Sequence, residues 1–171
     1  MIIMKYEIVY VSKTGNTEKA AIALDGMLPD EQTKITPFPQ EAPSLDADVY
    51  LLGFGVYRGS CPFELLDFLS GLSGKTILLF GTARISAAEP FKRQIESSIL
   101  AFLPDDCEYL GLYLIPGKYS KAGFDYFYNH FQAEDHPELV RNLYHLYEEA
   151  QHHPSGEDLQ HLCQWAKGRL M

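Results

Sequence analysis

The sequence predicts an α/β fold, a doubly wound three-layer sandwich in which a five-stranded parallel sheet lies between two layers of helices. Short apolar runs alternate along the chain with helical patterns, and four of the five runs lack the apolar–polar alternation of a half-exposed strand. A chain of 171 residues with 46% hydrophobic content can also bury one substantial core.

The predicted strands are the apolar runs at residues 5–11, 33–38, 47–54, 75–80 and 108–115. Helical patterns lie between them at residues 17–28, 62–71 and 87–102. The second of these helices has a defined start, because Ser60 can cap it and Pro62 suits an early helical position. This βαβ alternation is typical of a doubly wound sheet.

The chain after residue 120 has a different texture. Aromatic residues crowd residues 123–136, and a helical pattern follows Pro137. The aromatics either cover a binding site or form the core of an added helix. A last helix begins where Ser155 and Asp158 form a capping-box pattern. We expect one domain over residues 1–171, with a core at 1–120, a helical elaboration at 121–154 and a C-terminal helix at 155–171.

The connection after the first strand reads Ser12-Lys13-Thr14-Gly15-Asn16-Thr17 and leads directly into a helical pattern. Such a strand–turn–helix unit surrounds one point with backbone N–H groups and hydroxyls at the positive end of a helix dipole, where a phosphate dianion is well held. The spacing of Ser12, Thr14, Gly15 and Thr17 resembles the FMN phosphate loop of flavodoxins, Ser/Thr-x-Thr-Gly-x-Thr. This segment therefore predicts a phosphate site.

Two other kinds of phosphate-binding loop fit this segment less well. A Walker A loop needs a Lys-Ser/Thr pair at the start of the helix, whereas Lys13 precedes the glycine. A dinucleotide-binding loop needs three glycines, and this loop has only Gly15. The loop therefore suits a terminal monophosphate. The remaining alternative is an ordinary turn in which a Thr or Asn side chain caps the helix.

Ligands of doubly wound sheets bind beyond the carboxyl ends of the strands, so the segments after the other strands complete the predicted site. Gly53-Phe54-Gly55-Val56-Tyr57-Arg58-Gly59 follows the third strand, and its glycines let the backbone approach a flat ligand and let its carbonyls reorient. A reduced flavin gains a proton at N5 and requires such a carbonyl. Gly81-Thr82-Ala83-Arg84 follows the fourth strand, and Gly117-Lys118-Tyr119 follows the fifth.

Composition and charge exclude several classes of function. The formal net charge of -9 argues against nucleic acid, whose phosphates require a basic face, and leaves basic protein partners open. No apolar run is long enough for a membrane span, and Met1-Ile2-Ile3-Met4 is too short for a signal peptide, so we expect a cytoplasmic protein.

The cysteines and histidines predict no metal or disulfide chemistry. Cys61, Cys107 and Cys163 are odd in number and far apart, and the six histidines match no metal-binding spacing. Cys61, near a helix start, has either a lowered pKa or the inert character of a buried thiol. Redox chemistry must therefore come from a bound cofactor.

Further segments resemble a flavodoxin-domain subfamily from anaerobic bacteria. They are Gly53-Phe54, Arg58-Gly59-Ser60, Leu79-Phe80-Gly81-Thr82, Gly117-Lys118 and residues 153–159, and with the phosphate loop they cover most of the chain. The resemblance implies an FMN-binding sandwich of strand order 2-1-3-4-5 that shuttles electrons or serves a reductase, some relatives being associated with bilirubin reduction.

With the loops above, the resemblance implies FMN contacts at Ser12, Lys13, Thr14, Gly15, Asn16, Thr17, Gly53, Phe54, Gly55, Val56, Tyr57, Arg58, Gly59, Gly81, Thr82, Ala83, Arg84, Gly117, Lys118 and Tyr119. The chain departs from the subfamily at Gly55, where a tryptophan that can stack on the flavin is usual, and at Ile115, where a cysteine is common. Tyr57 is the natural substitute for the tryptophan, with packing at the sheet edge as its alternative. Tyr119 is a second candidate for the other face of the ring.

The predicted loops are positively charged within an acidic chain. They contain Lys13, Arg58, Arg84 and Lys118 but no Asp or Glu, although the chain has 23 acidic and 14 basic residues. Cations near the ring would stabilise anionic reduced flavin and raise its potential. The alternative is that the arginines point to solvent. We expect a less reducing flavin than in a typical flavodoxin.

Three functions fit these observations. The leading hypothesis is an FMN electron carrier that delivers electrons to a partner reductase, as a monomer or homodimer. The second is an FMN-dependent reductase in which Arg58 and Arg84 orient an anionic acceptor. The third is an accessory subunit that holds flavin weakly or not at all because of Gly55.

Overall fold

Five parallel strands form one sheet, and their order confirms the predicted topology. The computed structural model describes residues 2–57, 59–83, 89–118, 121–130 and 135–171. The strands are β1 (Tyr6–Val11), β2 (Thr33–Pro37), β3 (Val49–Gly55), β4 (Thr76–Ala83) and β5 (Glu108–Pro116), in the spatial order β2-β1-β3-β4-β5. The predicted fold class and strand order are therefore correct.

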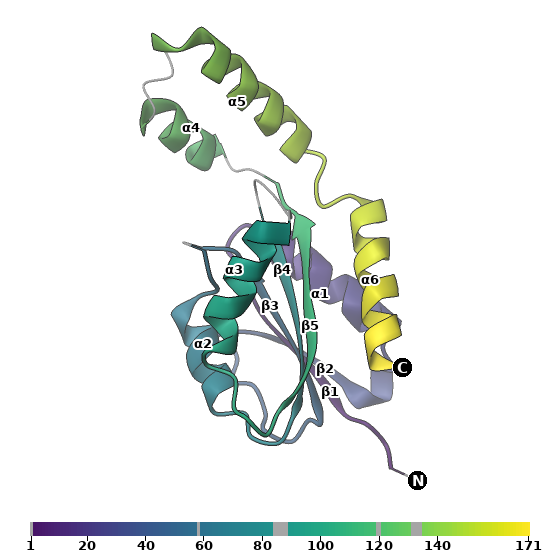
Figure 1. Cartoon of the computed structure of the whole chain (residues 1–171). Coiled ribbons are helices and arrows are strands. Elements are labelled where there is room, and N and C mark those ends of the chain that lie inside the picture. Colours follow the sequence, from purple (N-terminus) through teal and green to yellow (C-terminus); the bar gives the residue numbers. More distant parts are fainter. Residues whose placement is uncertain (1, 58, 84–88, 119–120, 131–134) are drawn as a thin grey trace.

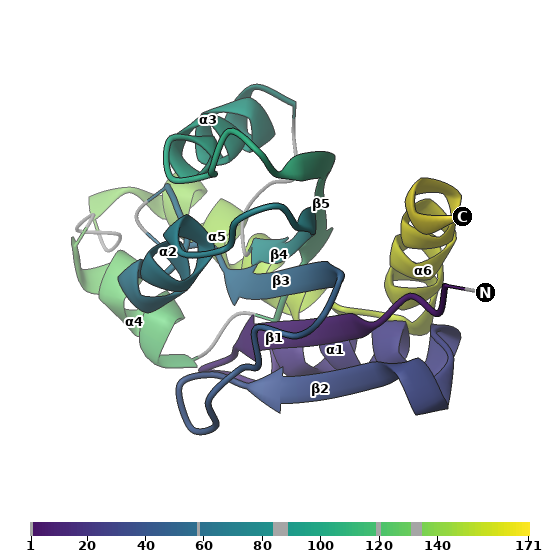
Figure 2. The same ribbon diagram turned by 90° about the horizontal axis from the view of Figure 1, so that it is seen from below.

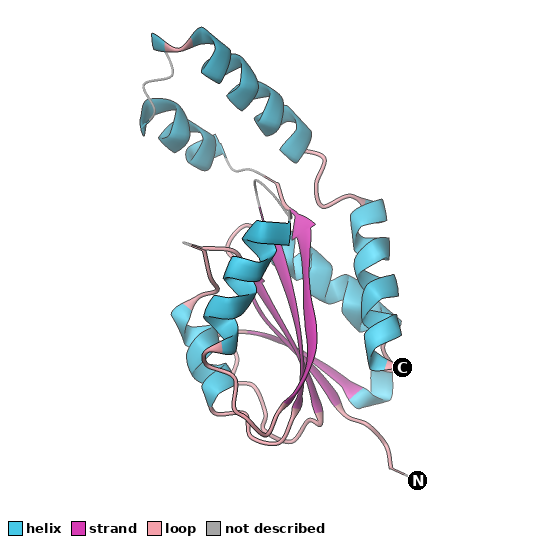
Figure 3. Cartoon of the chain, viewed as in Figure 1, coloured by secondary structure: helices cyan, strands magenta, loops and turns pink. Residues whose placement is uncertain are grey.

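Helices cover both faces of the sheet (Figures 1 and 3). On one face lie α1 (Asn16–Met27) and α6 (Gly156–Leu170), and on the other lie α2 (Phe63–Ser70) and α3 (Glu89–Leu100), as the view along the layers in Figure 2 also shows. A short 3-10 helix, η1 (Asp30–Gln32), precedes β2. Within the part of the chain that the structure describes, none of the helices has the length and apolar character needed to cross a membrane.

Alternate residues of the central strands enter two separate cores. In β1, Ile8 and Tyr10 pack with α1 and α6, whereas Val9 and Val11 pack with α2 and α3. Successive side chains of a strand point to opposite faces, so a strand covered on both sides must be apolar throughout. This explains the continuous apolar runs in the sequence.

Three strands extend further than the sequence pattern predicts, β5 by a single residue to Pro116. β3 continues to Gly55 and β4 to Ala83, and the added residues still pair in register, with Gly55 opposite Thr82 and Thr82 opposite Ile115. Gly53 and Phe54 lie in β3, within the predicted strand at residues 47–54, whereas the interpretation of Gly55, Gly81, Thr82 and Ala83 as loop residues is wrong. The sequence analysis identifies strands by runs of apolar residues, so it does not recognise strand ends that consist of glycine and polar residues.

Gly53 and Gly81 are needed for packing inside the sheet. A Cβ on Gly53 would lie 2.2 Å from Cζ of Phe80, and one on Gly81 would lie 2.8 Å from Cδ2 of Leu114. Phe54 is itself fully buried in the core with α2 and α3. These three residues pack the strand ends from within, and their contacts with FMN stay predictions.

Helices α4 (Lys121–His130) and α5 (Pro137–Ala150) form an arm that extends beyond the carboxyl end of the sheet (Figure 1). Aromatic rings join the two helices. The ring centroid of Phe124 lies 6.2 Å from that of Tyr128, 5.0 Å from that of Tyr144 and 4.9 Å from that of Tyr147. Phe124 and Tyr128 thus form part of a core between the added helices, one of the two alternatives for the aromatic segment. Phe131 lies outside the described residues.

Helix α6 closes the sandwich against α1 and β5. Its start has the predicted capping box, in which Asp158 N–H donates to Ser155 Oγ at 3.1 Å and Ser155 N–H donates to Asp158 Oδ2 at 2.7 Å. Leu162 and Ala166 are fully buried in the same core as α1. The ring of Trp165 lies 5.2 Å from that of Tyr113 on β5. Helix α6 therefore packs against α1 and shares a core with it.

We expect Gly53→Ala to lower the free energy of unfolding by about 1–3 kcal/mol, because the added methyl group overpacks the buried ring of Phe80. Urea denaturation measures this change. The matched control is Gly26→Ala in α1, where a Cβ meets nothing within 4 Å and should stabilise the helix by about 0.5–1 kcal/mol. Equal stability of Gly53→Ala and the wild type would contradict this account.

Candidate functional site

The turn between β1 and α1 has the geometry of an anion site. Gly15 stands at the N-cap of α1 with φ +90°, a conformation that suits glycine, so the N-cap residue itself offers no side chain, and Ser12 Oγ accepts from the backbone N–H of Glu18 instead. The alternative of a helix capped by a Thr or Asn side chain is therefore wrong. The first-turn amides of Asn16 and Thr17 have no acceptor within the helix, so they are available to an anion.

Ser12 shapes this turn. Its Oγ accepts hydrogen bonds from the backbone N–H of Gly15 at 3.1 Å and from that of Glu18 at 3.3 Å. The hydroxyl thus folds the turn back onto the start of α1. Ser12 organises the loop that the sequence predicts for a phosphate.

Two buried polar side chains at the start of α1 join this turn to the ends of β4 and β5. Asn16 Nδ2 donates to the carbonyl of Lys118 at 3.1 Å, and the hydroxyls of Thr17 and Thr82 are 3.0 Å apart. A Cβ on Gly117 would lie 2.7 Å from Asn16 Nδ2, so a glycine is needed for this approach. Three of the four segments that the sequence assigned to one site therefore meet here.

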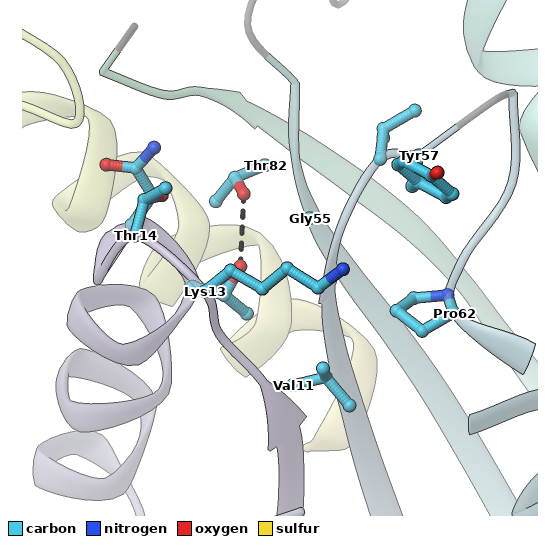
Figure 4. Close-up of a pocket in the computed structure, with 10 residues that line it drawn as sticks. Val11, Lys13, Thr14, Gly55, Tyr57, Pro62 and Thr82 are labelled. Carbon is cyan, nitrogen blue, oxygen red and sulfur yellow. Dashed lines mark hydrogen bonds between the residues drawn. The ribbon is translucent and has the colours of Figure 1, made fainter. Parts of the chain in front are cut away.

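A small pocket of about 80 Å³ opens at this junction (Figure 4). Its described lining consists of Val11, Lys13, Thr14, Asn16, Thr17, Gly55, Val56, Tyr57, Pro62 and Thr82. Eight of these residues were predicted from the sequence, whereas Val11 and Pro62 were missed because apolar residues next to a turn carry no signal of binding.

Of the other predicted contacts, nine lie among the described residues and three do not. Ser12 and Gly15 shape the turn; Gly53, Phe54 and Gly81 pack within the sheet; Gly59, Ala83, Gly117 and Lys118 lie in neighbouring strands and turns. Arg58, Arg84 and Tyr119 lie outside the described residues. The proposed roles of these three residues remain predictions.

Lys13 and Tyr57 face each other across the pocket. The Lys13 side chain leaves the β1–α1 turn and crosses the pocket toward the ring of Tyr57, with Nζ 5.2 Å from the ring centroid (Figure 4). This is within the range of a cation–π contact. Tyr57 is 54% exposed, so its ring is available at the pocket mouth rather than packed in the core.

Gly55 leaves open space at the floor of the pocket. A Cβ at this position would make only ordinary contacts, 3.6 Å from Thr82 Oγ1 and 3.9 Å from Thr17 Oγ1. A side chain here would therefore begin beside the Thr17–Thr82 pair. The absence of one enlarges the space between the phosphate loop and Tyr57.

The segment that follows Tyr57 differs from the sequence interpretation in one respect. α2 begins at Phe63 with Pro62 at its N-cap, so Ser60 does not cap this helix. Instead, the backbone of Ser60 pairs with that of Tyr57. The N–H and the carbonyl of Ser60 are thus both bonded in this turn.

Titratable groups near the pocket do not supply a nucleophile. Cys61 is buried, and burial raises the pKa of its thiol to about 12, so the alternative of a low-pKa cysteine is wrong. None of the described residues that line the pocket is His, Cys, Asp or Glu. Within the described residues, no group of three or more His, Cys, Asp or Glu side chains could hold a metal ion.

A family model described as flavodoxin domain matches residues 7–167. The chain belongs to the flavodoxin domain family. The match includes all five strands apart from Tyr6 of β1, together with the β1–α1 turn and most of α6. Membership in the flavodoxin domain family supports FMN as the cofactor of this chain.

Two curated flavodoxin-like relatives are similar over nearly their whole length. A flavodoxin-like domain-containing protein BilS from Clostridioides difficile (strain CD3) is 25% identical over 173 residues, covering 98% of this chain and 97% of the relative. The protein of the same name from Clostridium symbiosum (strain WAL-14163) is 25% identical and covers 91% and 90%, respectively.

Solved flavodoxin structures share the fold. A flavodoxin of Streptococcus pneumoniae TIGR4 has a TM-score of 0.58 at 17% identity and covers 95% of this chain and 94% of its own. A flavoprotein from Lactobacillus acidophilus NCFM, solved in complex with FMN, has a TM-score of 0.51 at 17% identity and covers 66% of this chain and 93% of its own. These likenesses show the flavodoxin fold.

The hydroxyl pair at the base of the pocket provides a test of how this flavodoxin domain is assembled. We expect Thr17→Val and Thr82→Val each to lower the free energy of unfolding by about 1–3 kcal/mol, because each leaves a buried hydroxyl without its partner. The double variant should lose less than the sum of the two single losses. Chemical denaturation of all four proteins measures this coupling, and strictly additive losses would contradict it.

Proposed function

We propose that this chain is an FMN-binding electron-transfer protein that delivers electrons to a partner reductase. The observation that carries the proposal is the β1–α1 turn, where Gly15 adopts φ +90° at an N-cap without a side-chain cap. Uncapped first-turn amides at a helix N-terminus favour a terminal phosphate. Of the three functions that the sequence leaves open, the carrier is the one we adopt.

The residues of the pocket suit the parts of FMN. The backbone amides of the β1–α1 turn and the Thr14 hydroxyl would hold the phosphate, with Ser12 keeping the turn in shape. Tyr57 would lie against the ring system, and Gly55 leaves room for it. FMN, when bound, accepts and donates electrons that the side chains of the pocket cannot carry themselves.

The chemistry of the lining favours a carrier over a stand-alone enzyme. A reductase acting on a small substrate benefits from a positioned acid or base. The described lining offers Lys13 and Tyr57 as its ionisable side chains, and both lie at the mouth of the pocket. A protein partner that receives electrons requires only that the ring be accessible from outside.

The layout of the chain fits the same proposal. We infer that residues 1–120 form the cofactor-binding core, that residues 121–154 elaborate it and that residues 155–171 complete it within one domain. The α4–α5 arm extends from the end of the sheet at which the pocket lies (Figure 1). A partner that approaches the pocket would meet this arm.

The first test measures binding of FMN and of riboflavin, which lacks the phosphate. We expect a desalted preparation to show flavin absorbance with FMN released in a 1:1 ratio, and the flavin-free protein to bind FMN at least about 100-fold more tightly than riboflavin. Ser12→Ala should reduce this preference about tenfold, because the turn loses the acceptor for two of its amides.

Two outcomes would contradict the proposal. Equal affinity for FMN and riboflavin would show that the turn does not serve a phosphate, and a colourless protein that takes up neither would favour an accessory subunit. Addition of reduced pyridine nucleotide alone should leave the flavin absorbance unchanged. Bleaching under these conditions would favour a stand-alone reductase.

The second test concerns the charge of Lys13. We expect Lys13→Met to lower the midpoint potential of bound flavin by about 10–30 mV, because removal of a nearby cation destabilises anionic reduced flavin, and the exposure of Lys13 keeps the effect modest. Spectroelectrochemical titration measures the potential. Lys34→Met, an identical charge change on β2, is the control and should leave it unchanged. An unchanged potential in Lys13→Met would refute the predicted role of positive charge.

A further inference from the structure

Two sets of contacts stabilise the turn that contains Tyr57. On its own backbone, Tyr57 N–H donates to the Ser60 carbonyl at 2.8 Å, and Ser60 N–H donates to the Tyr57 carbonyl at 3.0 Å. Gly59 within it has φ +77°. The described residues of this segment, Tyr57, Gly59 and Ser60, are called the 57–60 turn, and Tyr57 lines the pocket.

The second support comes from α3, far away in the sequence. The Ser98 hydroxyl oxygen lies 2.9 Å from Ser60 Oγ and 3.4 Å from the Gly59 carbonyl, and it also donates to the Ile95 carbonyl of its own helix at 2.7 Å. A serine hydroxyl has a single proton to donate but can accept as well. When Ser98 donates to its helix, Ser60 can donate to Ser98, so the contact persists in either arrangement.

The packing of α3 fixes the position of Ser98 in this contact. Ile95 and Ile99, which flank Ser98 in the helix, are buried at 0% and 1% exposure in the core beneath α2 and α3. Ser98 therefore has a fixed position, whereas the 57–60 turn carries a half-exposed ring. Ser98 does not line the pocket, so its effect on a ligand would pass through the turn.

We propose that Ser98 is a positioning residue, which fixes the 57–60 turn from α3 and thereby sets the affinity of the pocket for flavin and the potential of the bound flavin. This inference rests on the proposed function. A turn held in one arrangement before binding loses less conformational freedom when a ring packs against it. A turn that is free to reorient also changes the backbone groups that face the ring, which alters the relative stability of oxidised and reduced flavin.

The test compares Ser98→Ala with Ser97→Ala, the neighbouring exposed serine on the same helix, and with Ser98→Thr, which retains a hydroxyl. We expect Ser98→Ala to weaken FMN binding about three- to tenfold, the range expected for loss of one hydrogen bond, and to shift the midpoint potential. Ser97→Ala should match the wild type, and Ser98→Thr should recover most of the affinity.

A measurement without flavin separates this inference from the proposed function. In the flavin-free protein, hydrogen exchange at the amides of Tyr57 and Ser60 should be faster in Ser98→Ala than in Ser97→Ala, while amides of β1 and β3 exchange at wild-type rates. Unchanged exchange at these two amides would overturn the positioning role, whatever the affinity.

The flavin measurements give the remaining outcomes. Wild-type affinity and potential in Ser98→Ala would overturn the inference although FMN binds. A weaker affinity with an unchanged potential and slower-folding or less stable protein would reduce Ser98 to a general structural role and would also overturn it. A wild-type protein that takes up no FMN would overturn the proposed function itself and, with it, the role of Ser98 toward flavin.

Discussion

The central strands of the sheet carry apolar side chains on both faces, so neither face can be left to water. In β1, Ile8 and Val9 are both fully buried although they point in opposite directions. Helices must therefore lie on both sides, and each must cross from the end of one parallel strand to the start of the next. As a result, the loops that begin helices gather at one edge of the sheet, where the pocket lies.

The pocket is stabilised by hydrogen bonds of buried side chains that line it. Asn16 bonds to the segment that follows β5 and Thr17 to the end of β4, and the close approach of Gly117 permits the Asn16 contact. These side chains are buried, so their hydrogen bonds are formed away from competing water. The turn that faces outward is thus built on polar contacts that fix it in relation to the sheet. Ser98 gives the Tyr57 segment a similar support from the opposite face.

Most of the fold and the position of the β1–α1 turn could be predicted from the sequence, because both leave local signals. Continuous apolar runs mark the strands, and Ser12, Thr14, Gly15 and Thr17 follow one another at fixed spacing. The ends of β3 and β4 could not be predicted in this way, since glycine and threonine there are retained by packing and pairing with distant strands. The contact between Ser98 and the 57–60 turn joins residues 38 positions apart, and no local pattern announces it.

The support of α1 by α6 has a consequence for the order of events during synthesis. Helix α1, which follows the β1–α1 turn, leaves the ribosome well before Leu162 and Ala166, which cover the apolar surface of α1. Until those residues emerge, the first helix lacks part of its core and the turn lacks a firm base. We therefore expect the β1–α1 turn to reach its final conformation only after α6 has been synthesised and has packed against α1.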